Sequence, residues 1–339
     1  MAARLAINGF GRIGRLVFRA VHESGRDDVE VVAVNDLAPP ETSAHLLQFD
    51  SVHGRFPGTV SLDGGRLDAG ESSVAVLAEP DPQKLPWGDL DVDVVLECTG
   101  RLADRGSAAQ HLEAGAARVL VSAPAKDVDR TVVVGVNDSM LQPGDRVVSN
   151  ASCTTNCLAP VAMVLHQLVG LDRGYMTTVH AYTADQRLQD TMHGDLRRAR
   201  GAAMSLIPTS TGAARAIGLV LPELAGRLDG CAIRVPTANV SLVDLVFDAG
   251  RATSADEINA AMAAAAAGAL RGVLAYTEAP LVSCDFNHVS ASATFDATQT
   301  QVVDGRLVRV LAWYDNEWGF SNRMADTAAR MAAFGGQVG

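Results

Sequence analysis

The residue types best suited to chemistry lie in an uncharged, hydroxyl-rich segment, Ser149–Cys157, at the end of a short apolar run. Cys153 stands where this run gives way to a predicted helix. Backbone N–H groups at a helix N-terminus favour a thiolate over a thiol, so the position predicts a lowered pKa and a nucleophile. Ser152 and Thr154 place hydroxyl donors on both sides, which suits a small anion. From these residues alone, a capping serine beside a buried structural cysteine is the alternative.

His180 is the candidate partner for this sulfur, because it ends an extended run, Met176–His180, that follows the predicted helix. The flanking segment 178–185 is rich in hydroxyl side chains rather than apolar ones, which favours a polar site. A histidine beside a nucleophilic cysteine acts as its base. A structural histidine is the alternative that spacing alone leaves open.

The other four cysteines carry no obvious chemistry. Cys157 lies one helical turn from Cys153, but Cys-x3-Cys without a second ligand pair is poor zinc spacing, so we predict a structural neighbour and no metal site. Cys98, Cys231 and Cys284 lie in apolar runs and are expected to be buried. An odd, scattered set does not form a disulfide framework, which favours the cytoplasm.

The elements that position these residues differ between the two halves of the chain. The first half alternates short β-branched strands with helical spacing, a rhythm that predicts a parallel, doubly wound sheet. Its predicted helix covers Arg12–His22, and its predicted strands are Leu5–Asn8, Val29–Asn35, Val92–Glu97, Val119–Ser122, Thr131–Val136 and Arg146–Ser149.

A glycine pattern, Gly9-x-Gly11-x-x-Gly14, lies between the first strand and the first helix. Glycines there let the backbone approach a pyrophosphate at the helix N-terminus. Asp36 closes the second strand roughly 20 residues further on, where a carboxylate can accept hydrogen bonds from an adenosine ribose. That carboxylate opposes a 2′-phosphate, so the pattern predicts NAD in preference to NADP. A tight glycine turn with a solvated aspartate is the alternative.

The second half favours a largely antiparallel sheet with helices on one face, which places a domain boundary near residue 152. Its predicted strands include Ala232–Val235, Ser241–Phe247 and Arg306–Tyr314. A small-residue helix is expected over Ala260–Leu270, after a capping box at Ser254–Glu257.

Composition narrows the class of protein. The chain of 339 residues, 48% of them hydrophobic, suits two domains of ordinary size. A formal net charge of −11 argues against nucleic acid or anionic membrane as a partner. No run is long enough for a signal peptide or a membrane span, so we expect a cytoplasmic protein.

Ordered segments along nearly the whole chain carry a family resemblance. They are Ile7–Arg15, Ser149–Cys157, His180–Thr183, Asp195–Arg200, Pro208–Ala214, Arg234–Thr237 and Trp313–Glu317. Together they resemble the phosphorylating glyceraldehyde-3-phosphate dehydrogenases of bacterial type. The resemblance implies an α/β Rossmann NAD-binding domain over residues 1–152 and an α+β catalytic domain over 153–315. It also implies a C-terminal helix, from about 316 to 339, that packs back on the first domain, and a homotetramer.

The resemblance further implies a reaction. Cys153 would attack the aldehyde of D-glyceraldehyde 3-phosphate, with His180 pairing with the thiolate and then taking the hydroxyl proton. Hydride transfer to NAD would leave a thioester, which inorganic phosphate would cleave to 1,3-bisphosphoglycerate.

Individual positions match the binding residues of the family. Those implied for the substrate phosphate and the attacking phosphate are Thr183, Arg234, Ser152, Thr154, Thr211 and Gly212, with Arg198 near both. Those implied for the cofactor are Gly9, Gly11, Arg12, Ile13, Gly14, Asp36, Thr99, Ser122 and Asn316, the last orienting the nicotinamide carboxamide.

Two departures from the family pattern bear on the cofactor. Pro80 stands where many NAD-dependent members carry an arginine beside the adenine, and Thr191-Met192 stand where many carry Leu-Pro. Small or polar residues at the second place accompany NADP tolerance in some relatives. Asp36 argues the other way, so we predict NAD preference with weak NADP use.

Three other functions are alternatives. Erythrose-4-phosphate dehydrogenases share several segments, but they generally lack Thr183 and the run Thr209–Gly212 present here. Semialdehyde dehydrogenases match far less well. An NAD-binding protein with Cys153 as an oxidation sensor belongs to a different class, but a sensor needs no second phosphate subsite.

Overall fold

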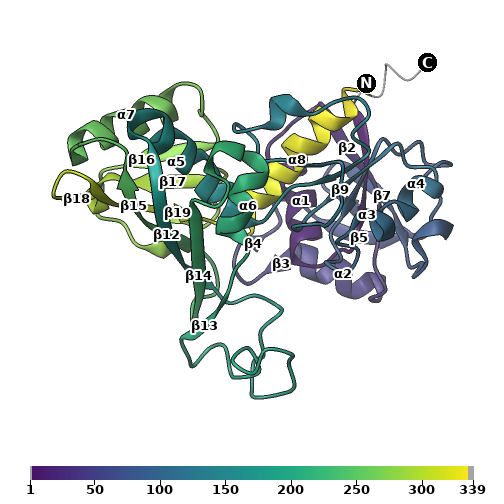
Figure 1. Cartoon of the computed structure of the whole chain (residues 1–339). Coiled ribbons are helices and arrows are strands. Elements are labelled where there is room, and N and C mark those ends of the chain that lie inside the picture. The colour runs from purple at the N-terminus through teal and green to yellow at the C-terminus, as the bar shows by residue number, and fades with distance from the viewer. Residues whose placement is uncertain (1, 335–339) are drawn as a thin grey trace. The chain divides into compact units, whose positions relative to one another are not determined.

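Two sheets organise the chain, one in each of two units (Figure 1). The structure is a computed structural model that describes residues 2–334. The first unit comprises the described residues up to Val134, Asp138–Ser152 and the described residues from Ser321 onward. The second comprises Gly135–Asn137 and Cys153–Phe320.

The first unit contains a nine-stranded sheet in the order β10-β11-β9-β8-β1-β2-β7-β6-β5. Neighbours from β10 to β7 pair in parallel, whereas β5 and β6 add an antiparallel edge. The strands are β1 (Ala3–Asn8), β2 (Val29–Asn35), β5 (Val60–Asp63), β6 (Arg66–Ala69), β7 (Ser72–Leu77), β8 (Val94–Glu97), β9 (Arg118–Val121), β10 (Arg130–Thr131) and β11 (Val147–Ser149). The predicted parallel sheet is confirmed.

The helices of this unit follow its strands, as the alternating sequence pattern predicts. They are α1 (Arg12–Glu23), α2 (Pro40–Gln48), α3 (Arg105–Ala108) and α4 (Gln110–Glu113), and a separate hairpin consists of β3 (Phe49–Asp50) and β4 (Gly54–Arg55). In α1, Leu16, Val17 and Ala20 are buried, so its apolar stripe faces the core.

One predicted strand is much shorter in the structure. The run Thr131–Val136 contributes only Thr131 to β10, although Val132 and Val133 are completely buried. The apolar run therefore indicated burial correctly but not pairing with a neighbouring strand, because both kinds of segment draw on the same residue types.

The last helix, α8 (Trp318–Ala332), begins near the predicted position. Within the first unit, Thr327 Oγ1 donates to Asn150 Oδ1 at 2.8 Å, and Arg26 pairs with Asp326 at 3.0 Å. The end of the predicted segment, residues 335–339, lies outside the described residues.

The second unit contains an eight-stranded sheet in the order β13-β14-β12-β15-β19-β17-β16, with β18 paired to β19. All pairings except β12 with β14 and β16 with β17 are antiparallel, which confirms the predicted character of this sheet. The strands are β12 (Leu171–Ala181), β13 (Ile207–Ser210), β14 (Leu228–Val235), β15 (Ser241–Ala249), β16 (Leu274–Thr277), β17 (Ala293–Asp296), β18 (Gln301–Val303) and β19 (Leu307–Tyr314).

Helix α5 (Cys153–Val169) packs across β12, β15, β17 and β19, and it also contacts α6 (Ala213–Val220) and α7 (Ala255–Ala267). Its first-turn residues Thr154 and Thr155 are buried, as is most of the helix, so the start of α5 is fixed against the sheet. Helix α7 begins directly after the predicted cap, where Ser254 Oγ accepts the N–H of Glu257 at 3.2 Å, and it ends at Ala267 rather than at Leu270.

The expectation for the peripheral cysteines is only partly right. Cys98 and Cys231 are half-buried, but Cys284 is exposed on a short 3-10 turn, Ser283–Phe286, and its predicted burial is wrong. Within residues 2–334, no helix is long and apolar enough to cross a membrane. The same residues contain no group of three or more His, Cys, Asp or Glu side chains that could hold a metal ion.

Candidate active site

Cys153 is the first residue of α5, as predicted, and it follows a strained turn. Strand β11 ends at Ser149, and Ala151 has a φ of 56°, a left-handed conformation that is rare for a residue with a side chain. The Ser149 hydroxyl accepts the Ala151 N–H at 3.1 Å and stabilises this turn. Strain of this kind is typical of functional sites.

Within the second unit, the Cys153 Sγ lies 3.5 Å from Nε2 of His180. On the other side of the ring, Nδ1 lies 2.6 Å from the Ala181 carbonyl oxygen. A carbonyl can only accept, so a proton on Nδ1 satisfies this contact and leaves the Nε2 lone pair facing the sulfur, as a base for the thiol requires. Arg234 Nη1, which can only donate, lies 2.7 Å from the same Nδ1 and favours the opposite tautomer.

Arg234 borders the same imidazole. Its Nη1 lies 2.9 Å from the Ala181 carbonyl oxygen and 2.7 Å from His180 Nδ1, and its Nε is buried with no hydrogen-bond partner in the described residues. The register of the parallel pair β12 and β14 places His180 directly opposite Arg234. Two strands far apart in the sequence thus bring a cation to the thiol and its base.

Burial dominates the electrostatics of the pair. Burial, assisted by the charge of Arg234, lowers the pKa of His180 to about 3, so the imidazole is neutral near neutral pH. Burial also raises the pKa of the Cys153 thiol above its usual value, against the opposing effects of Arg234 and of the Thr154 hydrogen bonds. The predicted lowering of the thiol pKa is therefore wrong: burial outweighs the opposing effects and raises the pKa of Cys153.

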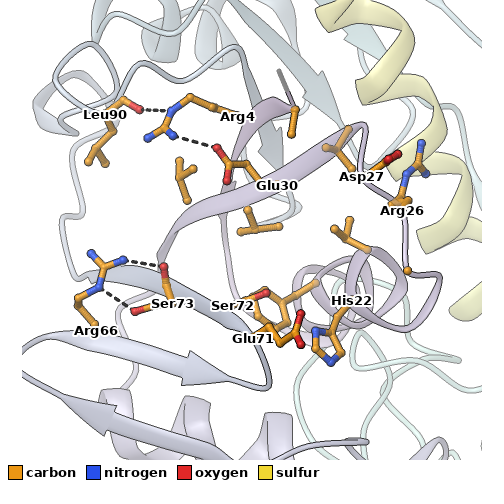
Figure 2. A pocket seen from close by; sticks show the side chains of 17 residues that line it. Arg4, His22, Arg26, Asp27, Glu30, Arg66, Glu71, Ser72, Ser73 and Leu90 are labelled. Atoms are coloured by element: carbon orange, nitrogen blue, oxygen red, sulfur yellow. Dashed lines mark hydrogen bonds and ion pairs between the residues drawn. The ribbon is translucent and has the colours of Figure 1, made fainter.

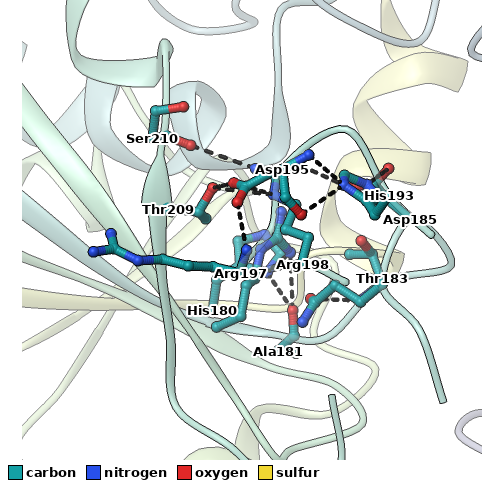
Figure 3. A network of polar contacts seen from close by, with 12 residues as sticks. His180, Ala181, Thr183, Asp185, His193, Asp195, Arg197, Arg198, Thr209 and Ser210 are labelled. Carbon is teal, nitrogen blue, oxygen red and sulfur yellow. Dashed lines mark hydrogen bonds and ion pairs between the residues drawn. The ribbon is translucent and has the colours of Figure 1, made fainter. Parts of the chain in front are cut away.

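A second arginine, Arg198, is held in a polar network on the loop between β12 and β13 (Figure 3). Its Nη1 pairs with Asp185 at 2.6 Å, and its Nε donates to the Thr209 hydroxyl at 3.0 Å. Thr209 in turn donates to Asp195 at 2.9 Å. The positive charge of Arg198 contributes to the lowered pKa of His180, which places it in the same electrostatic environment.

The other residues predicted for anions are spread around this centre. Thr154 forms a 2.8 Å hydrogen bond with the Tyr314 hydroxyl, and the Thr211 hydroxyl accepts the Ala213 N–H at 3.2 Å. Gly212 precedes α6, and Ser152 ends the first unit immediately before the thiol.

Thr183 lies just beyond β12, in a turn with Gln186. Among the described residues, none of Thr183, Thr211 and Gly212 is hydrogen-bonded to Cys153 or His180. The structure thus joins Cys153, His180 and Arg234 directly and leaves these three in nearby segments of the same unit.

In the first unit, the glycine pattern borders a cavity of about 300 Å³ at the carboxyl ends of β1, β2 and β8. Its lining includes Gly9, Gly11, Asp36, Pro80 and Thr99. A Cβ added to Gly9 would lie 2.7 Å from the Thr99 backbone nitrogen, and Gly9 has a φ of 92°. Only glycine fits there, because the loop passes this close to the neighbouring strand.

Asp36 is turned toward the backbone of this cavity. One of its oxygens accepts the Phe10 N–H at 2.7 Å, and the other accepts the Ala38 N–H at 2.9 Å. Each carboxylate oxygen has a second lone pair left for a hydroxyl. Arg12, at the start of α1, pairs with Asp50 at 2.7 Å, and Ile13 follows it.

Five of the predicted cofactor residues do not line this cavity: Arg12, Ile13, Gly14, Ser122 and Asn316. Ser122 follows β9 and forms a hydrogen bond with the Cys98 thiol. Asn316 belongs to the second unit, where its Oδ1 accepts the Ser241 hydroxyl proton at 2.8 Å.

Beneath the cavity lies a polar cluster that the sequence analysis missed. The buried carboxylate of Glu97 accepts from Asn8 Nδ2 at 2.6 Å, and from both the backbone N–H and the hydroxyl of Thr99. It also contacts His111 Nε2 at 3.1 Å. Trp87 donates to His111 Nδ1 at 3.0 Å, so Nε2 carries the proton and donates to Glu97.

A larger cavity of about 650 Å³ occupies another part of the first unit (Figure 2). Its arginines are already engaged: Arg4 pairs with Glu30 at 2.9 Å, and Arg66 donates to Ser73. It contains none of the predicted site residues. Volume alone does not identify an active site, and the smaller cavity has the residues that fit a dinucleotide.

Comparison with known proteins decides the family. Residues 3–105 match the model described as the glyceraldehyde 3-phosphate dehydrogenase NAD binding domain, and residues 152–316 match the C-terminal domain of the same family. The chain belongs to the glyceraldehyde-3-phosphate dehydrogenase family. It is 63% identical to the glyceraldehyde-3-phosphate dehydrogenase of Xanthobacter flavus, over 99% of this chain and 100% of the relative.

Other relatives agree. The proteins of the same name from Cereibacter sphaeroides and Geobacillus stearothermophilus are 61% and 56% identical, over 98% and 99% of this chain and 99% and 100% of the relatives. The predicted family, fold class and NAD cofactor are confirmed. The cavity fits the dinucleotide of the family, since its narrow glycine loop leaves room for a pyrophosphate and Asp36 retains acceptor capacity.

Three polar residues that are hydrogen-bonded to predicted site residues were not found from the sequence: Glu97, Ser241 and Tyr314. Glu97 left one usable signal, a carboxylate at the end of an otherwise apolar strand. Ser241 and Tyr314 gave none, because their importance depends on the register of β15 with β19, in which they lie opposite each other.

Proposed function

We propose that the chain oxidises D-glyceraldehyde 3-phosphate to 1,3-bisphosphoglycerate, with NAD as hydride acceptor and inorganic phosphate as second substrate. An NAD-dependent glyceraldehyde-3-phosphate dehydrogenase is the function that family membership indicates. The single observation that carries the mechanism is the 3.5 Å contact of the Cys153 sulfur with His180 Nε2, with the opposite ring nitrogen bonded to Ala181.

The first step uses the neutral pair. As the Cys153 sulfur attacks the aldehyde carbon, its proton passes to His180 Nε2 and then to the former carbonyl oxygen, which gives a hemithioacetal. In this order, the site holds no unpaired thiolate before substrate arrives. The raised pKa of Cys153 and the lowered pKa of His180 keep both groups neutral in the free protein and oppose a separate proton transfer, so the transfer must be coupled to formation of the carbon–sulfur bond.

The second step forms the thioester. His180 removes the proton of the hemithioacetal hydroxyl while the hemithioacetal carbon loses a hydride. When bound, NAD would supply the acceptor for that hydride. Phosphate oxygen then attacks the thioester carbon. The carbon–sulfur bond breaks, and the protonated His180 returns its proton to the Cys153 sulfur.

Anion binding is assigned mainly to the cations near Cys153 and His180. We propose that Arg234 and Thr183 hold the substrate phosphate, and that Arg198 serves both phosphates. Ser152, Thr154, Thr211 and Gly212 complete the site for the attacking phosphate. The buried, unpartnered Nε of Arg234 supports this role, since a guanidinium with free donors is suited to a phosphate oxygen.

Most of the residues assigned to the cofactor lie in the first unit. We propose that residues 1–152, with the C-terminal helix, bind NAD and that 153–315 perform the chemistry. Gly9, Gly11, Arg12, Ile13 and Gly14 would hold the pyrophosphate, Asp36 the adenosine ribose, Thr99 and Ser122 the groove, and Asn316 the carboxamide of the nicotinamide.

The test is the rate of NADH formation from D-glyceraldehyde 3-phosphate and NAD, with and without inorganic phosphate. Turnover should require phosphate and should be lost in Cys153→Ser, whereas Cys284→Ser, which alters an exposed cysteine, should retain it. NAD binding should survive in Cys153→Ser. Turnover with erythrose 4-phosphate alone, or turnover that ignores phosphate, would refute the proposal.

A homotetramer is the proposed assembly. The loop between β12 and β13 exposes large apolar side chains, from 68% exposed at Leu206 to 90% at Met192, with Leu188, Leu196 and Met204 between them. Such a concentration of apolar surface is typical of an interface. Light scattering should give the mass of four chains, and a mass of one chain would contradict the proposal.

We also propose a cytoplasmic location, which the five free cysteines support, since thiols stay reduced there. Osmotic shock of the source cells should leave the protein in the retained cytosolic fraction. Its release with the periplasmic fraction would contradict this location.

A further inference from the structure

Ser241, the first residue of β15, joins two parts of the second unit that the proposed mechanism uses separately. Its side chain is 1% exposed, and its hydroxyl contacts both Ala181 and Asn316. Ala181 follows the base His180 directly. Asn316 is the residue assigned to the nicotinamide, so this inference rests on the proposed function.

The direction of each hydrogen bond follows from chemistry. The backbone N–H of Ala181 can only donate, so the Ser241 oxygen accepts it at 3.0 Å. The hydroxyl proton is then available for the Asn316 Oδ1, which lies 2.8 Å away. Ser241 therefore selects one of the two orientations of the Asn316 amide, the one with the oxygen facing β15.

The nitrogen of that amide is left for a ligand. Asn316 as a residue is 5% exposed, and within residues 2–334 its side chain makes a hydrogen bond through Oδ1 and none through Nδ2. Nδ2 is not one of the fully buried polar atoms that lack a partner, so it remains open to a ligand. Two N–H groups held in a fixed direction are suited to the carbonyl oxygen of a carboxamide, whereas a flipped amide would present an acceptor there.

The backbone on both sides of this contact is held in place. Val240, just before Ser241, has a φ of 67°, which is costly for a β-branched residue. Asn239 donates to Asp315 at 2.8 Å, and Asp315 accepts the Trp318 N–H at 2.7 Å. The strained backbone before Ser241 and the hydrogen bonds of Asp315 before Asn316 together indicate that the fold holds the Ser241 hydroxyl in one position.

We propose that Ser241 is a positioning residue whose hydroxyl fixes the Asn316 amide with its nitrogen available to the nicotinamide carboxamide. Ser241 touches neither cofactor nor substrate in this assignment. It acts through Asn316, and its bond to Ala181 holds the same amide in register with the strand that carries His180.

The experiment compares the dissociation constants of NAD and ADP-ribose, which lacks the nicotinamide, by calorimetry on the full chain. Ser241→Ala should weaken NAD binding roughly two- to tenfold, the value of one net hydrogen bond, and leave ADP-ribose binding unchanged. Ser292→Ala is the matched control, because Ser292 is equally buried in the same unit but its hydroxyl has no partner. It should change neither constant.

A double-mutant cycle separates positioning from general damage. In an Asn316→Ala background, Ser241→Ala should have no further effect on NAD binding, and Ser241→Thr, which keeps the hydroxyl, should restore most of the loss in the parent. An equal loss for NAD and ADP-ribose, or an additive loss in the double variant, would overturn the proposal.

These binding measurements need no turnover. A chain that fails the phosphate-dependence assay can still pass or fail them, so the two proposals can be rejected separately.

Discussion

The cofactor cavity of the first unit and the thiol site of the second satisfy their polar groups to different degrees. Around the cavity, the Glu97 carboxylate accepts from Asn8, His111 and Thr99. At the thiol site, Arg234 brings a cation to within 2.7 Å of an imidazole nitrogen, and its own Nε lacks a partner. The first arrangement is complete without a ligand, whereas in the described residues the Arg234 guanidinium is hydrogen-bonded to no carboxylate.

The difference separates two ways of building a site. Paired polar groups fix a geometry, because each partner would be left unsatisfied in any other arrangement. Unpaired buried cations oppose stability and are retained where they serve binding or catalysis. We infer that the paired polar groups around the cavity hold a fixed geometry for the cofactor. We also infer that the Arg234 cation at the thiol site is available to attract an anionic substrate.

The largest expected effect comes from removing the base at the thiol site. His180→Asn removes the Nε2 lone pair that faces Cys153, so kcat for NADH formation should fall roughly 10²- to 10⁴-fold, the usual contribution of a general base. The dissociation constant of NAD should stay unchanged, because His180 is not among the residues assigned to the cofactor. Steady-state kinetics and an NAD titration measure both.

The pH dependence of stability gives the same variant a second signature. In the folded chain the pKa of His180 is about 3, against about 6.5 unfolded, so below pH 6.5 the unfolded chain takes up a proton that the folded chain refuses. This contribution to stability is present above that pH and is lost as pH falls toward 3. His180→Asn should therefore show a shallower loss of melting temperature between these limits, and parallel curves would contradict the neutral, buried imidazole.

Sequence reasoning succeeded where the signal is local. The strand-to-helix change at Cys153, the glycine turn before α1 and the acid that closes β2 each depend on a few consecutive residues. It could not place Arg234 beside His180, because that contact depends on the register of β12 with β14, which is a tertiary property.

The error in the thiol pKa has the same origin. A helix N-terminus is visible in the sequence, but the depth of burial that overrides it comes from the packing of α5 on the sheet. Glu97 and His111 were missed because their partners, Asn8 and Trp87, come from separate segments.

A smaller effect is expected at the cavity, where Glu97→Gln replaces a pure acceptor by a group that also donates. Whichever way the new amide turns, its NH2 meets the donors of Thr99 or those of Asn8 and His111. The free energy of unfolding should fall by about 1–3 kcal/mol, with a weaker affinity for NAD. Glu30→Gln, at an exposed ion pair with Arg4, is the control. If Glu97→Gln and Glu30→Gln changed the melting temperature equally, the buried Glu97 cluster would contribute no more to stability than an exposed ion pair.

The smallest effect concerns which dinucleotide the cavity accepts. Asp36→Ala removes a ribose acceptor and the negative charge that opposes a 2′-phosphate, so NAD affinity should fall while NADP affinity holds or rises. The preference for NAD should narrow by about tenfold, since one charge-assisted hydrogen bond is worth roughly 1.5–3 kcal/mol and solvent screens part of it.

The control for this last change uses the other cavity of the same unit. Asp27→Ala removes a carboxylate from the larger cavity, where no cofactor residue is proposed, and should leave the NAD to NADP ratio as it is. Binding titrations with both dinucleotides measure the two ratios. If Asp36→Ala leaves its ratio unchanged as well, the two hydrogen bonds from Phe10 and Ala38 are the whole role of this carboxylate, and specificity must come from elsewhere.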